Sequence, residues 1–232
     1  LAMMGRSVTI LDQDFDGSSV PRMLGIQGKQ KLKYGARGII PAHDELGLGM
    51  HVVGLGLLYE DEVVTMFHEM RRGTTEEFLA NVEYGERDYL IVDLPPGTSS
   101  DCCNLLQYIP NLDGTVTVTA PTNVSQLAAR KATLLSAKAG SRVLGIIENM
   151  SGYICGECNN EFDFMKRGGG ESLAEELGVD FLGRIPLHPE VSASGDEGVP
   201  FVYKYPENPA SKMMMETAKR LEEIVLKLKT DN

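Results

Sequence analysis

The chain contains no tryptophan, only four cysteines, and no uncharged apolar run of the roughly 18 residues that a transmembrane helix needs. Its first residues do not resemble a secretory signal peptide either. Basic residues are a minority, since 22 Lys and Arg stand against 33 Asp and Glu and give a net charge of −11. Nucleic-acid binding requires clustered Lys and Arg that neutralise phosphates. The sequence therefore predicts a cytoplasmic protein whose partners include neither nucleic acid nor membrane.

The composition is that of an ordinary globular protein. Hydrophobic residues make up 42% of the chain and charged residues 24%, which argues against disorder. Glycine and proline, at 25 and 11 residues, are scattered rather than periodic, which argues against a fibrous protein. A chain of 232 residues buries enough surface to fold without disulfides. Because it has no internal repeat and no Ser/Gly-rich linker, we predict a single nucleotide-binding domain over residues 1–232.

Short β-rich runs alternate with helical patterns along the whole chain, which predicts right-handed βαβ crossovers. The runs at residues 89–92 and 143–147 are apolar without alternation, as in parallel strands that are buried on both faces. We therefore predict the α/β class, with a doubly wound, mainly parallel sheet and helices on both of its faces. Strands are expected at residues 8–11, 51–53, 89–92, 115–118, 143–147 and 181–185, and helices near residues 75–84, 101–109, 124–139, 170–177 and 209–229.

Two of the predicted strands end in aspartate. The first runs into Asp12 and Asp14, and the third runs into Asp93, which Pro95-Pro96-Gly97 follows closely. Ligands of open parallel sheets bind beyond the carboxyl ends of the strands, and Mg²⁺ is held by carboxylates, retained waters and substrate phosphates. An aspartate after one strand is also ordinary turn chemistry. Two such strand ends favour a magnesium-dependent nucleotide site.

The cysteines form two pairs, Cys102-Cys103 and Cys155-Gly156-Glu157-Cys158. In a cytosolic chain, a Cys-x-x-Cys pair is more often metal-binding or redox-active than disulfide-bonded. One such pair supplies two thiolates, whereas a tetrahedral zinc site or a cubane iron–sulfur cluster takes four. A two-fold dimer brings the same pair in twice, so Cys155 and Cys158 are candidate ligands of a metal centre shared by two subunits. Zinc stays an alternative, and Cys102 and Cys103 are interpreted as structural.

Five motifs, in order along the chain, resemble those of the Mrp-type ATPases, which are MinD-like P-loop proteins that carry iron–sulfur clusters. Residues 10–25 are similar to the family's switch I region, and residues 91–98 are similar to its Walker B motif and switch II. Residues 148–158 resemble its Asn-Met-Ser segment with the Cys-x-x-Cys pair that follows. Residues 168–171 and 183–190 complete the order. The resemblance covers most of the chain.

The resemblance implies an ATP-binding and ATP-hydrolysing carrier that assembles a 4Fe–4S cluster at a homodimer interface and transfers it to apo iron–sulfur proteins. It implies that Asp14 orients or activates the attacking water. Asp12 is the second implied catalytic residue, and it would support the end of the switch I region.

The same resemblance implies a nucleotide site and a cluster site. Asp93 would hold Mg²⁺ through water, Gly97 would sense the γ-phosphate of ATP, and Asn149 would read the adenine edge. Pro186 also belongs to the implied nucleotide site. The cluster would be ligated by Cys155 and Cys158.

One motif of the family is missing. Its phosphate loop, a Gly-Lys-Gly-Gly-Val-Gly-Lys-Ser/Thr-like sequence, occurs nowhere in the 232 residues. We expect this loop one helix before Val8, in a segment of the native protein that the present chain lacks, and ATP hydrolysis depends on it. Smaller departures are Asp16 in place of an aromatic residue, Asp101 one position beyond the usual acid, and His188 in place of an aspartate. The glycines at 168–170 are interpreted as a flexible lead into a helix.

Two other functions are compatible with the residues. A MinD- or ParA-like positioning ATPase that binds a membrane needs a basic amphipathic tail, and residues 224–229 are short for that purpose. A zinc-stabilised dimeric adaptor without hydrolysis would use the same two cysteines of the Cys-x-x-Cys pair. Metal analysis of anaerobically purified protein separates both from a cluster carrier.

Overall fold

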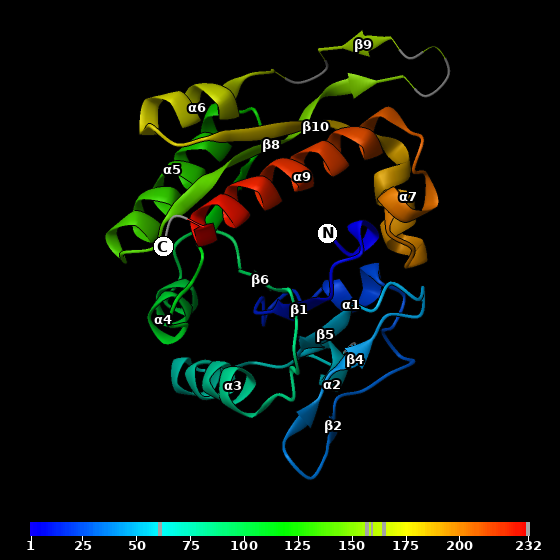
Figure 1. The fold of residues 1–232 in the computed structure, drawn as a ribbon, viewed down its shortest axis with the longest axis vertical. Helices are drawn as coiled ribbons and strands as arrows, with labels where there is room; N and C mark the ends of the chain where they lie inside the picture. The colour runs from blue at the N-terminus through cyan, green and yellow to red at the C-terminus, as the bar shows by residue number, and fades with distance from the viewer. Residues whose placement is uncertain (60–61, 156–157, 159, 164–165, 231–232) are drawn as a thin grey trace. The chain divides into compact units, whose positions relative to one another are not determined.

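Figure 1 shows the computed structural model of the chain, which describes residues 1–59, 62–155, 158, 160–163 and 166–230. The chain divides into two compact units. Unit 1 comprises Leu1–Ile109 with Ser194–Pro200, and unit 2 comprises Pro110–Ala193 with Phe201–Asn232. Each unit has its own mainly parallel sheet, so the α/β class predicted from the sequence is confirmed.

Unit 1 combines a four-stranded sheet with a small two-stranded one. Its strands are β1 (Val8–Asp12), β2 (Lys33–Tyr34), β3 (Ile39–Ile40), β4 (Ala42–His43), β5 (His51–Gly54) and β6 (Tyr89–Asp93), and its helices are the 3-10 turn Ala2–Met4, α1 (Val20–Met23), α2 (Gly56–Tyr59), α3 (His68–Asn81) and α4 (Ser100–Tyr108). The larger sheet has the order β4-β5-β1-β6, in which β1 is parallel to both β5 and β6. The carboxyl ends of these three strands therefore lie at one edge of the sheet.

The core of unit 1 lies around β1 and β5. Leu11, Val52 and Val53 are completely buried, and Phe78 of α3 belongs to the same apolar cluster. The sequence pattern predicts a helix near residues 75–84, whereas α3 begins at His68 and ends at Asn81. The pattern misses the first two turns of α3 because they are polar and exposed and include Gly73, a poor helix former.

Strand β6 differs from the prediction that residues 89–92 are buried on both faces. Leu90 is 40% exposed and Ile91 is 38% exposed. The physical reason is the position of β6 at the end of the order β4-β5-β1-β6, where, among the described residues, its sheet partner is β1. Because adjacent side chains of a strand point to opposite faces, both faces of β6 are partly open, whereas the prediction required each face to be covered.

Unit 2 is a three-stranded sheet with an added hairpin strand and covering helices (Figure 1). Its strands are β7 (Thr115–Thr119), β8 (Val143–Ile154), β9 (Glu161–Phe162) and β10 (Phe181–Leu187), and its helices are α5 (Asn123–Lys138), α6 (Gly169–Leu177), α8 (Phe201–Lys204) and α9 (Pro209–Thr230); α7 (Pro189–Glu197) continues from unit 2 into unit 1. The order is β10-β8-β7 with all pairs parallel, and β9 is antiparallel to the end of β8.

Helices cover both faces of the sheet in unit 2. Adjacent residues of β10 point to opposite faces, as in any strand. A Cβ placed on Gly183 would clash with the side chain of Thr217 in α9, whereas Arg184 forms an ion pair of 2.6 Å with Glu171 of α6. Consequently α9 and α6 lie on opposite faces. The predicted burial of residues 143–147 is confirmed for Leu144, Gly145 and Ile146 of β8, which are buried, whereas Val143 and Ile147 are half-buried.

The glycine run at 168–170 has a structural role in unit 2. Glu148 is completely buried in β8, and its carboxylate accepts hydrogen bonds from the backbone N–H groups of Gly168 and Gly170 and from the hydroxyl of Ser151. A Cβ on Gly170 would come within 2.9 Å of the Glu148 Cβ. The interpretation of these glycines as a flexible lead is wrong, because they let the start of α6 close on an internal carboxylate.

None of the helices within the described residues is long and apolar enough to cross a membrane.

Candidate functional site

Two aspartates meet at the carboxyl edge of the sheet in unit 1. Asp12 and Asp93 are directly paired in the parallel register of β1 and β6. The backbone N–H of Gln13 then donates to the carbonyl oxygen of Asp93 at 2.9 Å, which carries the pairing one residue past β1. The structure thus brings together the two strand ends that the sequence singles out.

Asp12 holds the loop that follows β1. The residue is 1% exposed, and its carboxylate accepts hydrogen bonds from the Asp14 N–H at 3.1 Å, the Ser18 hydroxyl at 2.8 Å and the Val20 N–H at 3.3 Å. Burial raises the pKa of Asp12 above its ordinary value, and these donors oppose that rise. With its oxygens engaged in this way, Asp12 is placed to position the loop.

Asp14 and Asp93 present carboxylates that are more open. Asp14 is half-buried, and its Oδ1 accepts the N–H of Gly17 at 3.0 Å. Desolvation, followed by the charges of Asp12 and Asp14, raises the pKa of Asp93. Like charges close to one another favour a bound cation, which relieves their repulsion.

A magnesium ion at this edge would need more than protein ligands. Among the described residues, no three His, Cys, Asp or Glu side chains are arranged to hold a metal ion. Water and phosphate oxygens would therefore complete the coordination, as is usual for Mg²⁺. Gly97, beyond β6, is exposed with a φ of 88°, a conformation that favours glycine and leaves its backbone open to a ligand.

Arg71 of α3 is a further residue of this region that sequence reasoning missed. Its guanidinium pairs with Asp16 in the loop after β1 and, at 3.0 Å, with Asp101 in the first turn of α4. Its Nε also donates to the Met66 carbonyl at 3.2 Å. Arg71 therefore ties the loop after β1 to the segment after β6. The signal was present in the sequence, because Asp16 and Asp101 are two departures from the family pattern, and both turn out to be its partners.

Removing Arg71 is expected to destabilise unit 1 strongly. The Asp101 side chain is only 5% exposed, and Arg71→Met leaves this carboxylate buried and unpaired. We expect the free energy of unfolding to fall by about 3–5 kcal/mol, since loss of one partner of a buried pair is costly. Urea denaturation measures the change.

The neighbouring arginine provides the control for this prediction. Arg72 pairs with Glu76 on the exposed side of α3, and Arg72→Met is expected to leave the free energy of unfolding nearly unchanged. The double variant Arg71→Met with Asp101→Asn should recover part of the loss, because it removes the buried charge. Equal effects of the two arginine substitutions would contradict the bridging role.

Unit 2 brings the two predicted adenine-side residues close in register. Asn149 of β8 pairs with Ile185 of β10, which precedes the buried Pro186. The Asn149 Oδ1 accepts the N–H of Met150 at 2.9 Å, and Met150 has a φ of 56°. His188 is buried beyond the end of β10, where its Nδ1 lies 2.5 Å from a carboxylate oxygen of Glu190 and its ring packs on Phe201.

The four cysteines are all free thiols, and they occupy two kinds of environment. Cys102 is buried in α4, with its Sγ at 3.8 Å from the carbonyl oxygens of Pro95 and Gly97. Cys155 is half-buried directly after β8, where its N–H donates to the Asn160 carbonyl at 3.0 Å, and Cys158 is exposed. The Cys-x-x-Cys pair is thus the more accessible one, which suits a thiolate ligand.

The chain is similar to proteins of known class along almost its whole length. A family model described as "ParA: NUBPL iron-transfer P-loop NTPase" matches residues 1–222. The iron-sulfur cluster carrier protein of Saccharolobus solfataricus is 37% identical over 225 residues, which cover 97% of this chain and 76% of that protein. The protein of the same name from Methanocaldococcus jannaschii is 40% identical over 203 residues, covering 87% of this chain and 69% of that protein.

Solved structures show the same architecture. A nucleotide-binding protein from Archaeoglobus fulgidus in complex with ADP is 29% identical, with a TM-score of 0.74 over 91% of this chain and 80% of that one. The MinD cell division protein of Aquifex aeolicus has a TM-score of 0.65 over 96% of this chain and 86% of that one, and at 21% identity it shows likeness of fold alone.

Proposed function

The chain belongs to the NUBPL iron-transfer P-loop NTPase family, and on that premise we propose that it is an ATP-hydrolysing carrier of iron–sulfur clusters. In this proposal a homodimer holds one 4Fe–4S cluster as cargo and transfers it to apo iron–sulfur proteins. The relatives in S. solfataricus and M. jannaschii are named iron-sulfur cluster carrier proteins, which supports the same cargo here.

The observation that carries the proposal is the Cys-x-x-Cys pair, in which Cys155 is half-buried, Cys158 is exposed and neither forms a disulfide. A cubane cluster takes four thiolates, and each chain offers this pair once. Two copies related by a two-fold axis supply four. The accessibility of both residues lets cargo be exchanged with another protein, and we propose a cytoplasmic location for the carrier.

The nucleotide half of the proposal uses the strand-end residues that the family resemblance singles out. Asp14 would orient the attacking water, Asp12 would hold the loop that carries Asp14, and Asp93 would bind Mg²⁺ through water. Gly97 would approach the γ-phosphate. When bound, Mg²⁺ neutralises charge on the phosphates.

The family resemblance also assigns Asn149 and Pro186 to nucleotide binding. The NH₂ group of Asn149 makes no hydrogen bond within the part of the chain that the structure describes, so it is available to an adenine nitrogen. The buried Pro186 would help to shape the surface beside it. An MgATP-dependent change in the loops after β1 and β6 is how hydrolysis would bias the dimer.

Anaerobic reconstitution with iron and sulfide tests the proposed cargo. The expected result is about four iron and four sulfide per two chains, together with a dimer in analytical ultracentrifugation. Stoichiometric zinc without iron uptake would favour the zinc-stabilised adaptor instead. A protein that binds neither metal would favour a positioning ATPase.

A further inference from the structure

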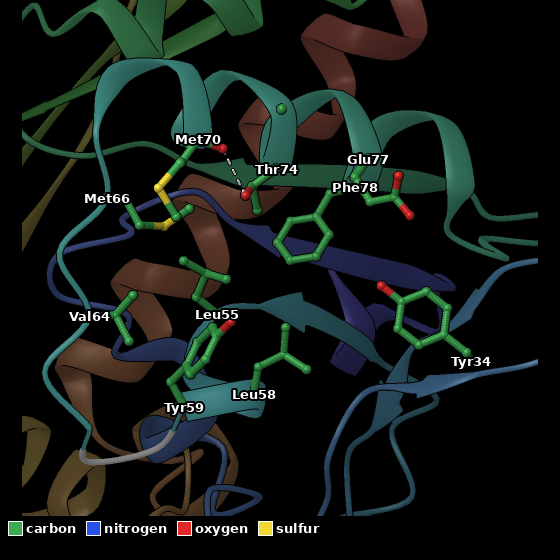
Figure 2. A pocket seen from close by; sticks show the side chains of 11 residues that line it. Tyr34, Leu55, Leu58, Tyr59, Val64, Met66, Met70, Thr74, Glu77 and Phe78 are labelled. Atoms are coloured by element: carbon green, nitrogen blue, oxygen red, sulfur yellow. Dashed lines mark hydrogen bonds between the residues drawn. The ribbon is translucent and has the colours of Figure 1, made fainter.

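An apolar groove in unit 1 lies apart from the residues assigned above (Figure 2). Its volume is about 390 Å³, and side chains of β2, α2, α3 and the segment before α3 form its walls. In Figure 2 the ring of Tyr34 on β2 faces Phe78 and Glu77 of α3, while Leu58 of α2 points toward Phe78. We call this hollow, with Leu55 at its base, the apolar groove.

The walls of the apolar groove are unusually open to solvent for their chemistry. Tyr34 is 76% exposed, Met70 is 52% exposed and Tyr59 is 42% exposed. Next to them, Phe67 and Val63 are 75% and 98% exposed on the segment that leads into α3. Large apolar side chains that gather at one surface mark an interaction site, and flexible methionines suit a surface that adapts to a partner.

The lining of the apolar groove carries negative charge. Glu77 is the charged residue among the described side chains that line it, and its Oε2 accepts a hydrogen bond from Asn81 at 2.7 Å. It forms no ion pair within the described residues. The two arginines of α3 are engaged elsewhere, because Arg71 pairs with Asp16 and Asp101 and Arg72 pairs with Glu76.

Acidic side chains also border the apolar groove. Glu62 lines the adjoining hollow, which shares Leu55, Tyr59 and Val64 with it, and Glu69 is exposed in the first turn of α3. The groove therefore combines apolar walls with a negative potential. The complementary ligand has apolar side chains and positive charge.

We propose that the apolar groove is a docking site for a short segment of a partner protein, in which apolar residues are flanked by Lys or Arg. The apolar residues would fill the space between Tyr34, Tyr59 and Met70, and a cation would reach Glu77. A second copy of this chain would have to bring apolar residues flanked by Lys or Arg to the groove, and the experiment below separates this occupant from a partner segment. An anionic membrane is disfavoured by the acidic side chains around the groove.

The position of the groove gives docking a route to the candidate site. Helix α3 lines the groove with Met70, Thr74 and Glu77. The same helix carries Arg71 and also Thr75, whose hydroxyl donates to the Gln13 side chain at 2.9 Å. A partner in the groove thus contacts the helix that holds the loop after β1. The proposal itself stands on the groove and does not depend on cluster binding.

Selection from a randomised peptide library tests the proposal. Twelve-residue peptides displayed on phage are selected on the wild-type protein and counter-selected on the Met70→Lys variant. We expect the enriched peptides to carry at least two large apolar residues and a net positive charge. The matched control for counter-selection is Leu226→Lys, since Leu226 is 48% exposed on α9 and lies outside the groove.

Binding of the enriched peptides can be read from a single fluorophore. Because the chain has no tryptophan, Tyr34→Trp places one reporter on the groove wall. In this background, Glu77→Lys should lower the binding affinity of the cationic peptides at least about tenfold, equal to 1.4 kcal/mol. The same substitution should raise the affinity of acidic peptides. Loss of binding in Met70→Lys with retention in Leu226→Lys supports the groove as the site.

Several results would overturn the proposal. These are enrichment of acidic peptides, peptides that bind Met70→Lys as well as wild type, and no enrichment at all. A fluorescence shift of the Tyr34→Trp variant on addition of phosphatidylglycerol vesicles would assign the groove to a membrane. A shift that follows protein concentration alone would assign it to a second copy.

Discussion

Cys155→Ala and Cys158→Ala are each expected to abolish cluster binding, whereas Cys102→Ala should leave it intact. In a two-fold dimer each substitution removes two of four thiolates at once, because the same residue is lost from both chains. Two remaining thiolates do not satisfy a cubane cluster. The expected loss is therefore nearly complete rather than partial.

The Cys102 variant is the informative control because it removes the same chemical group. Cys102 is 4% exposed in α4 and lies against the backbone carbonyls of Pro95 and Gly97, so its thiol is used for packing. Visible absorption, iron and sulfide are measured after anaerobic reconstitution of all three variants. Equal loss in the three would mean that the Cys-x-x-Cys pair has no special role in holding the cargo.

The sequence predicted those parts of the molecule that depend on local pattern. Residues 8–11 and 143–147 were predicted as strands and lie in β1 and β8, and residues 124–139 were predicted as a helix and correspond to α5. The proximity of Asp12 and Asp93 was also predictable from the sequence, because parallel strands place their carboxyl ends at one edge of a sheet.

Long-range partners could not be predicted in the same way. Glu148 looks like a strand-end polar residue in sequence, and only the fold places Gly168 and Gly170 against its carboxylate. Arg71 lies 30 residues from Asp101 and 55 from Asp16, and helical periodicity does not indicate either pair. The edge position of β6 likewise depends on strand order, which the hydrophobic pattern of residues 89–92 does not contain.

Asp14→Asn is expected to lower ATP turnover by a large factor, about 10²–10⁴, with little change in nucleotide affinity. One oxygen of Asp14 accepts the Gly17 N–H, and within the described residues its second oxygen accepts no hydrogen bond and is available to a water. An amide keeps the shape of the side chain but loses its negative charge. A group that orients or activates water acts mainly in the transition state, so its loss affects kcat more than binding.

The assay requires the protein with its phosphate-binding loop, and the 232 residues alone serve as the negative control because that loop is absent from them. Asp113→Asn is the matched control, since Asp113 is a surface carboxylate near Lys229 and should leave kcat unchanged. Asp93→Asn should instead raise the Mg²⁺ concentration needed for nucleotide binding. If Asp14→Asn weakens binding as much as it slows turnover, Asp14 contacts the bound nucleotide or its metal rather than the attacking water. The roles of Asp14 and Asp93 at the two adjacent strand ends would then have to be exchanged.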